Sequence, residues 1–187
     1  MRSRGRGTPA VRPSEREVVA VAMTFLEGRG YRVYPNPDRN DYFDLVARRG
    51  AEVGLVEAKV ANGRAVLVQA LKRRAWGDWV AVVLPSETTA ARLVSRTTGS
   101  RAAPVGVWVA RGGAVHVVRE ARPWPRSGAD DPFEETRARF RAVLDQIDSG
   151  EIPPDVRWEG VVRAVRRAGG GRGFAEWRLD ETVGPDP

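Results

Sequence analysis

The sequence has 187 residues, of which 42% are hydrophobic and 29% charged, and 31 basic against 24 acidic residues give a formal charge of +7. This length and composition exclude wholesale disorder and two large domains, and they predict one compact domain with an appendage. The absence of Cys and the presence of a single His exclude disulfides, thiolate chemistry and metal sites built on cysteines or several histidines.

Residues 1–13 are expected to form a flexible basic arm, because this segment is rich in Gly and Pro and contains no acid. A second basic segment lies at 157–172. Since each phosphate neutralised by a basic side chain releases counterions, positive charge in two extensions favours a polyanionic partner. Charge alone equally allows a solubility tail and a solvated helix face. The arginines that we assign to phosphate contacts are Arg2, Arg4, Arg6, Arg12, Arg163, Arg166 and Arg167.

The region 14–120 is predicted to be an α/β core with a mixed sheet flanked by helices. Its first helix begins with a capping box, Ser14-Glu15-Arg16-Glu17, and ends near Gly28. The alternation of apolar residues and turn residues places the other elements. They are strands over 31–34, 43–48 and 53–60, a helix over 65–75, a strand over 79–84, a helix over 88–96, and strands over 105–109 and 114–118.

A helical extension is predicted after the core. Residues 121–131 are a Pro- and Gly-containing connector, and 132–168 contain two helices, the first with Pro132 at its first position. The second helix carries an apolar stripe with Trp158, for which helix packing is favoured over base stacking. These helices could also mediate a homodimer. Residues 169–187 are expected to be a flexible tail. Their glycine run lacks the Lys-Ser/Thr of a phosphate-binding loop and is interpreted as a linker.

No apolar segment of the sequence reaches the roughly 18 residues needed to cross a bilayer. The first residues are polar and basic and do not form the apolar core of a signal peptide. We therefore expect a cytoplasmic protein that does not associate with membranes.

Two carboxylates and a lysine are predicted to meet at the hairpin of strands 43–48 and 53–60. A turn near Gly50 places Asp44 opposite Glu57, and their Cβ atoms are then about 5 Å apart if they share a face. Glu57 and Lys59 point to the same face because side chains alternate along a strand. Two carboxylates this close repel each other unless a cation compensates. Oxygen ligands of this kind suit Mg²⁺.

Other interpretations of these charges remain open. The three residues could simply decorate an exposed strand end, where charged side chains are common. Asp41 competes with Asp44 as the first carboxylate, although the hairpin register favours Asp44. His116, on the last predicted strand, is expected to be structural.

The order of these elements, with Asp44 on one strand and Glu57-Ala58-Lys59 ending the next, resembles the PD-(D/E)xK nuclease superfamily and its restriction-endonuclease-like fold. The resemblance covers about residues 14–118 and differs at Phe43, where many members have Pro. It implies that Asp44, Glu57 and the backbone carbonyl of Ala58 bind Mg²⁺, for which Mn²⁺ substitutes. It also implies that Lys59 is catalytic.

The resemblance suggests further site residues. Many members add a Glu from the first helix, and Glu17 is the residue assigned here, with Glu15 as its competitor and the capping box as its alternative role. Gln69, on the helix after Lys59, resembles the Gln-containing helical motif of some members. Lys72 on the same helix is assigned to nucleic-acid binding.

The expected function is that of a metal-dependent deoxyribonuclease, an endonuclease that hydrolyses the DNA backbone. A protein that uses the same fold to bind nucleic acid or to assemble without cleaving is the alternative, and so is a nuclease acting on RNA.

Overall fold

The computed structural model describes residues 13–36, 42–60, 63–125, 131–154 and 157–168. Asp41, the arm with its four arginines and the tail from residue 169 lie outside the described residues. The elements in chain order are α1 (Glu15–Gly28), β1 (Arg32–Pro35), β2 (Leu45–Arg49), β3 (Glu52–Ala58), α2 (Gly63–Arg73), β4 (Trp79–Leu84), α3 (Glu87–Thr97), β5 (Gly106–Arg111), β6 (Ala114–Arg119), α4 (Glu134–Ser149) and α5 (Trp158–Ala168).

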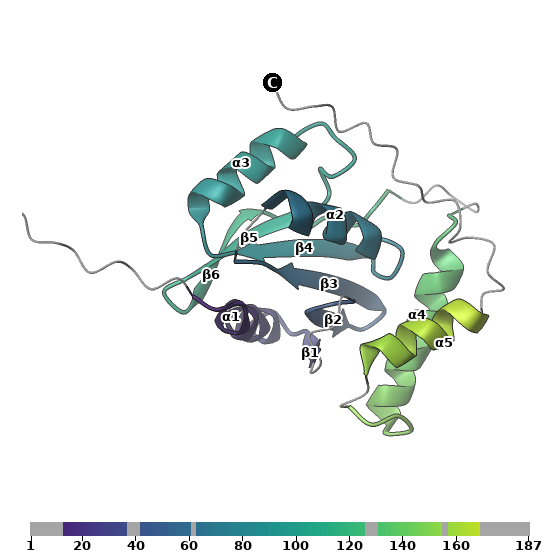
Figure 1. Ribbon diagram of the computed structural model, residues 1–187. Helices are drawn as coiled ribbons and strands as arrows, with labels where there is room; N and C mark the ends of the chain where they lie inside the picture. Colours follow the sequence, from purple (N-terminus) through teal and green to yellow (C-terminus); the bar gives the residue numbers. More distant parts are fainter. Residues whose placement is uncertain (1–12, 37–41, 61–62, 126–130, 155–156, 169–187) are drawn as a thin grey trace, which may run out of the picture.

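The strands form a six-stranded sheet in the order β1-β2-β3-β4-β5-β6 (Figure 1). β1, β2 and β3 are antiparallel neighbours, β3, β4 and β5 run parallel, and β6 returns antiparallel to β5. Helices join the parallel strands, as a parallel connection requires. The predicted mixed α/β sheet flanked by helices is confirmed.

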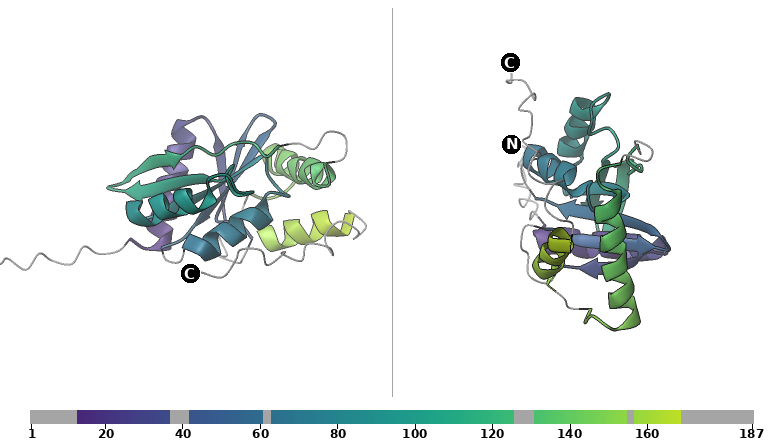
Figure 2. Two further views of the ribbon diagram at one scale, coloured as in Figure 1. Left: turned by 90° about the horizontal axis from the view of Figure 1, so that it is seen from above. Right: turned by 90° about the vertical axis from the view of Figure 1, so that its right-hand side faces the viewer.

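Helices cover both faces of the sheet (Figures 1 and 2). The apolar side of α1, with Val18, Ala22 and Leu26, packs on one face in a cluster that includes Trp79 and Trp108. The other face holds a larger cluster, to which α2, α3, α4 and α5 all contribute. Side chains of β3 alternate between the two clusters, which fixes the face to which each residue at its end points.

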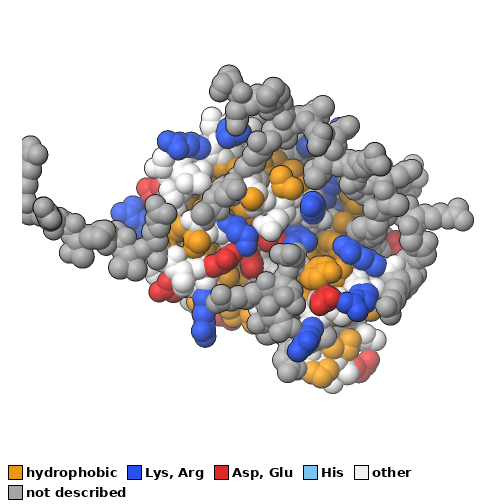
Figure 3. Space-filling model, in the orientation of Figure 1, with side chains coloured by type: hydrophobic (Ala, Val, Ile, Leu, Met, Phe, Trp, Pro, Cys, Tyr) orange, Lys and Arg blue, Asp and Glu red, His pale blue; other side chains and the backbone are white. Residues whose placement is uncertain are grey.

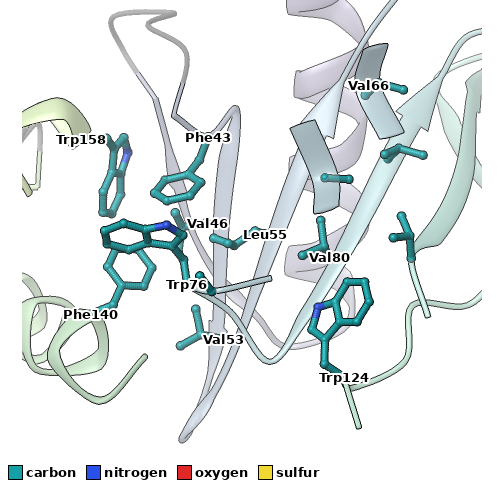
Figure 4. Close-up of a cluster of buried hydrophobic side chains, with 14 of the residues drawn as sticks. Phe43, Val46, Val53, Leu55, Val66, Trp76, Val80, Trp124, Phe140 and Trp158 are labelled. Carbon is teal, nitrogen blue, oxygen red and sulfur yellow. The ribbon is translucent and has the colours of Figure 1, made fainter. Parts of the chain in front are cut away.

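The helical extension shares the core of the sheet. Phe140 of α4 and Trp158 of α5 meet Phe43 and Trp76 in an aromatic cluster (Figure 4), with ring centroids 5.6 Å apart for Phe43 and Phe140 and 6.2 Å for Phe43 and Trp158. The apolar stripe predicted on α5 is therefore buried within the chain, as helix packing required. A homodimer through these helices stays a prediction and would need their other surfaces.

The start of α4 differs from the prediction. Pro132 was expected at the first helical position, but the helix begins at Glu134 with Phe133 as its N-cap. The Asp131 carboxylate accepts a hydrogen bond from the N–H of Phe133 at 3.0 Å and pairs with Arg137 at 2.7 Å. This side-chain turn holds Pro132 outside the helix, because Asp favours such local bonds to the backbone.

The start of the connector packs against the core. Trp124 packs into the large cluster, and its backbone N–H donates to the Asp78 carbonyl at 3.0 Å. The connector therefore docks on the core before it leads to the extension.

We expect Gly54→Ala to destabilise the fold by about 1–3 kcal/mol, the usual cost of overpacking a core. A Cβ at Gly54 would lie 1.9 Å from Cζ2 of Trp79, whose ring is buried beneath α1. Urea unfolding measures the difference. Gly28→Ala is the matched control, because a Cβ there meets nothing within 4 Å, and equal losses in both variants would contradict the prediction.

Candidate functional site

The predicted hairpin pairing is confirmed. Leu45 pairs with Val56, so the same register continued by one residue sets Asp44 opposite Glu57. Asp44 lies directly before β2, and its Oδ2 accepts a hydrogen bond from the backbone N–H of Ala58 at 2.6 Å. That bond ties the first predicted carboxylate to the end of the strand that carries the second.

Glu57 is held on the face of the sheet that α2 covers. Its Oε1 lies 2.6 Å from Nε of Arg73, and the two side chains are only 4% and 11% exposed. Arg73 stands in the last turn of α2, so the connection from β3 into this helix places it over the strand end. Burial nevertheless outweighs the attraction of Arg73 and raises the pKa of Glu57 to about 7.

Lys59 bridges the strand end and the first helix. Its backbone N–H donates to the Val83 carbonyl of β4 at 3.1 Å, and its Nζ lies 2.6 Å from Oε1 of Glu15. Burial opposes the charge, but the Glu15 hydrogen bond and the charges of Asp44 and Glu57 outweigh it and raise the pKa of Lys59. Lys59 is therefore an ammonium donor at neutral pH.

The acid of α1 that contacts Lys59 is Glu15, whereas Glu17 takes the capping-box role that was its alternative. Oε2 of Glu17 accepts from the backbone N–H of Ser14 at 2.6 Å and from its hydroxyl at 2.8 Å, which completes the capping box. These bonds to Ser14 also lower the pKa of Glu17. Glu15 begins the helix two residues earlier and faces Lys59 instead.

The site contains one more acidic side chain than basic side chains. Asp44, Glu57 and Glu15 stand with Lys59 and Arg73, which leaves a formal charge of −1 when all are ionised. Burial raises the pKa of Asp44, and the Ala58 hydrogen bond and the Lys59 charge only partly oppose that rise. The group can therefore accept a further cation or a proton.

No three His, Cys, Asp or Glu side chains in the described parts of the chain are grouped so that they could hold a metal. Of the predicted metal ligands, Asp44 and Glu57 are the two carboxylates that the hairpin register, continued beyond Leu45 and Val56, sets opposite each other. A cation bound here would take its remaining ligands from the backbone and from water.

Gln69 and Lys72 both lie on α2, but in different surroundings. Oε1 of Gln69 is buried and has no hydrogen-bond partner among the described residues. Gln69 precedes Arg73 by one helical turn and so shares its face of the helix. Lys72 is exposed, and His116 is exposed on the edge strand β6.

Basic residues of α5 lie beside the residues that lead into Asp44. The Arg166 guanidinium lies 6.0 Å from the Tyr42 ring centroid and 5.9 Å from that of Trp76. Arg163 is exposed and pairs with Glu159 of the same helix, whereas the side chain of Arg167 lies outside the described residues. Figure 3 shows basic side chains on the side of the molecule that is turned to the viewer in Figure 1, where both α1 and α5 are seen.

The sequence does not single out Arg73, and the one feature that points to it is weak. Arg73 follows Gln69 by four residues on a predicted helix, and that spacing aligns the two side chains. With 31 basic residues in the chain, no feature of the sequence alone separated this arginine from its neighbours.

Comparison with known proteins adds little about function. No protein-family model matches the chain, and no curated protein matches its sequence. One similar solved structure is the SPO1766 protein of unknown function from Silicibacter pomeroyi, with 16% identity and a TM-score of 0.49 over 89% of this chain and all of the other. No described helix is long and apolar enough to span a membrane. The family resemblance thus stays a prediction.

The buried carboxylate predicts a pH dependence of stability without divalent cations. The pKa of Glu57 rises from 4.5 to about 7 on folding, so the folded state binds the proton more tightly. The free energy of unfolding of the wild type should therefore fall relative to Glu57→Gln between pH 4.5 and 7, by up to about 3 kcal/mol. Urea unfolding of both proteins in chelator measures this difference, and a constant or growing advantage of the wild type would contradict it.

Proposed function

We propose that this protein is a metal-dependent phosphodiesterase that hydrolyses DNA, an endonuclease of the PD-(D/E)xK type acting in the cytoplasm. The observation that carries the proposal is the position of Asp44 and Glu57, each one residue beyond the paired Leu45 and Val56 of a hairpin whose second strand leads directly into Lys59. Few purely structural roles call for two facing, largely buried carboxylates with a lysine at the same strand end.

The arrangement of the core supports this proposal. An initial helix, a three-stranded antiparallel meander, a helix and a parallel fourth strand follow one another. That is the αβββαβ order which the resemblance to the restriction-endonuclease-like fold implies. Asp44 lies directly before the second strand of the meander and Glu57 on the third, close to the positions that this resemblance implies.

The residues present fit Mg²⁺, and Mn²⁺ in its place. Both carboxylates are hard oxygen donors, and burial raises the pKa of each. A cation bound beside them would therefore offset the unfavourable free energy of burying their negative charges. Asp44, Glu57 and the Ala58 carbonyl would hold it. A divalent cation bound there supplies charge neutralisation at a scissile phosphate and a more acidic attacking water.

The other residues act by position and charge. Lys59 keeps its proton at neutral pH and donates hydrogen bonds to oxygens on which negative charge develops. Glu15 holds the Lys59 ammonium in place through its 2.6 Å contact. The buried Oε1 of Gln69 is an acceptor that can orient a water molecule or a phosphate-bound group.

DNA would lie along the face that α5 borders. Arg163, Arg166 and Lys72 are exposed and can contact backbone phosphates without reading sequence. The arm arginines and Arg167 are assigned the same role. Binding should therefore weaken steeply as salt concentration rises. A homodimer formed through exposed surfaces of α4 and α5 would allow both strands to be cut.

The experiment that tests the proposal is incubation of the full chain with plasmid, linear duplex, single-stranded and branched DNA and with RNA. Each substrate is tested with Mg²⁺, with Mn²⁺ and with chelator, using wild type and Asp44→Asn. We expect cleavage of at least one DNA by wild type that needs the divalent cation and is lost in Asp44→Asn.

Other results would favour the other candidates. Cleavage of RNA but of no DNA would indicate that the protein is a nuclease acting on RNA. Binding of DNA without cleavage of any substrate under all conditions would instead indicate a non-cleaving binding or assembly protein on this fold.

A further inference from the structure

We propose that Arg73 is the resting counter-ion of Glu57 and that a divalent cation and the Arg73 guanidinium compete for this carboxylate. Binding of a cation would then require Arg73 to leave Glu57. The inference rests on the proposed function only in naming the cation as Mg²⁺ or Mn²⁺, because the competition itself follows from the ion pair.

Arg73 and Glu57 form a direct ion pair. Nε of Arg73 lies 2.6 Å from Oε1 of Glu57, and the carboxylate side chain is only 4% exposed. A buried carboxylate needs a partner, and this guanidinium supplies one within the chain. A second cation on the same carboxylate would face a like charge at close range in a region of low dielectric, where repulsion is strong.

Arg73 has other contacts within reach when it leaves Glu57. It belongs to the last turn of α2, where its side chain is close to the helix end, and its guanidinium already lies 5.3 Å from the Phe43 ring centroid. An aromatic face stabilises a guanidinium when its carboxylate partner is lost. The buried Oε1 of Gln69, one turn earlier on the same face, is an acceptor without a partner among the described residues. The guanidinium can therefore move within its own helix face without losing every contact.

Lys59 differs from Arg73 in its ion-pair partner. Its ammonium is held by Glu15 on the opposite side of the strand end, and that contact does not involve Glu57 oxygens. A cation between Asp44 and Glu57 would therefore displace Arg73 before it displaces Lys59. The two cationic side chains of the site therefore have different roles. When the metal ion binds, Lys59 keeps its contact with Glu15, whereas Arg73 leaves Glu57.

The test is a titration of the full chain with Mn²⁺ and Mg²⁺ in the absence of DNA, followed by calorimetry. Wild type, Arg73→Met, Arg73→Lys and Glu57→Gln are compared at pH 8. We expect Arg73→Met to bind Mn²⁺ about tenfold or more tightly than wild type, because the competing charge is gone. Arg73→Lys, which keeps a charge, should stay closer to wild type, and Glu57→Gln should bind weakly or not at all.

A second measurement on the wild type guards against a variant that fails to fold. The Nε–H resonance of Arg73, followed by NMR during a Mg²⁺ titration, should shift and lose its protection from solvent exchange as the ion pair breaks. Chemical denaturation of each variant confirms that the proteins compared are folded.

The outcomes separate this inference from the proposed function. Equal or weaker Mn²⁺ binding by Arg73→Met, with an unmoved Arg73 resonance, overturns the competition even if the wild type cleaves DNA. Tight binding by Arg73→Met with none by wild type upholds the competition and counts against a metal-dependent activity. No binding by any of the proteins overturns both.

Discussion

Replacing Lys59 by Met is expected to lower the rate of DNA cleavage by about 10²–10³-fold, the usual effect of removing a donor that stabilises developing charge. Met keeps much of the length and apolar character of the side chain but donates no hydrogen bond. The Lys59 ammonium keeps its proton at neutral pH and is held in place by Glu15. Single-turnover cleavage at saturating protein measures the rate, and fluorescence anisotropy with labelled DNA shows that affinity changes much less.

Arg92→Met is the matched control for the Lys59 variant. It removes one positive charge from an exposed position of α3, and no ion pair is found for it among the described residues. The control should cleave at the wild-type rate. A Lys59→Met protein that cleaves as fast as Arg92→Met would contradict the catalytic role. Equal losses of DNA affinity in both variants would indicate that the loss comes from the change in net charge and not from the position of Lys59.

Most of the core could be predicted because local signals decide it. Gly50 sits in the β2–β3 turn with φ +60°, a conformation that glycine adopts without strain, and this turn fixes the register that faces Asp44 with Glu57. The continuous apolar run of β4 marks a strand buried on both faces, and its predicted and observed limits agree. Turn chemistry and hydrophobic pattern therefore located the two carboxylates before any long-range contact was known.

The remaining features depend on long-range packing that no local pattern encodes. Glu15 and Glu17 are two residues apart on one helix and point about 200° apart around its axis. Which of them faces the sheet depends on how α1 lies across it. Arg73 reaches Glu57 only because α2, which follows β3 in the chain, packs back over the end of that strand. The same holds for Trp124, whose burial follows from contacts with residues distant in sequence.

Replacing Phe140 by Ala should destabilise the protein by about 3–5 kcal/mol, the usual cost of truncating a buried aromatic side chain. Phe140 is fully buried, and its ring centroid lies 5.6 Å from those of Phe43 and Trp76 and 5.8 Å from that of Trp158. Urea unfolding measures the loss. Val118→Ala, at a position that is 42% exposed, should change stability by under about 0.5 kcal/mol.

The same variant tests whether the helical extension supports the site. Phe43 is adjacent to Asp44 in sequence and packs against both Phe140 and Trp158, so the aromatic cluster fixes the backbone that carries the first carboxylate. If the extension only binds DNA, Phe140→Ala should weaken DNA affinity and leave the rate of bound DNA cleavage unchanged. Because the cluster also positions Asp44, we expect the single-turnover rate to fall as well at temperatures where the variant is fully folded. A misplacement of about 1 Å is enough to slow such a reaction by about 10²-fold.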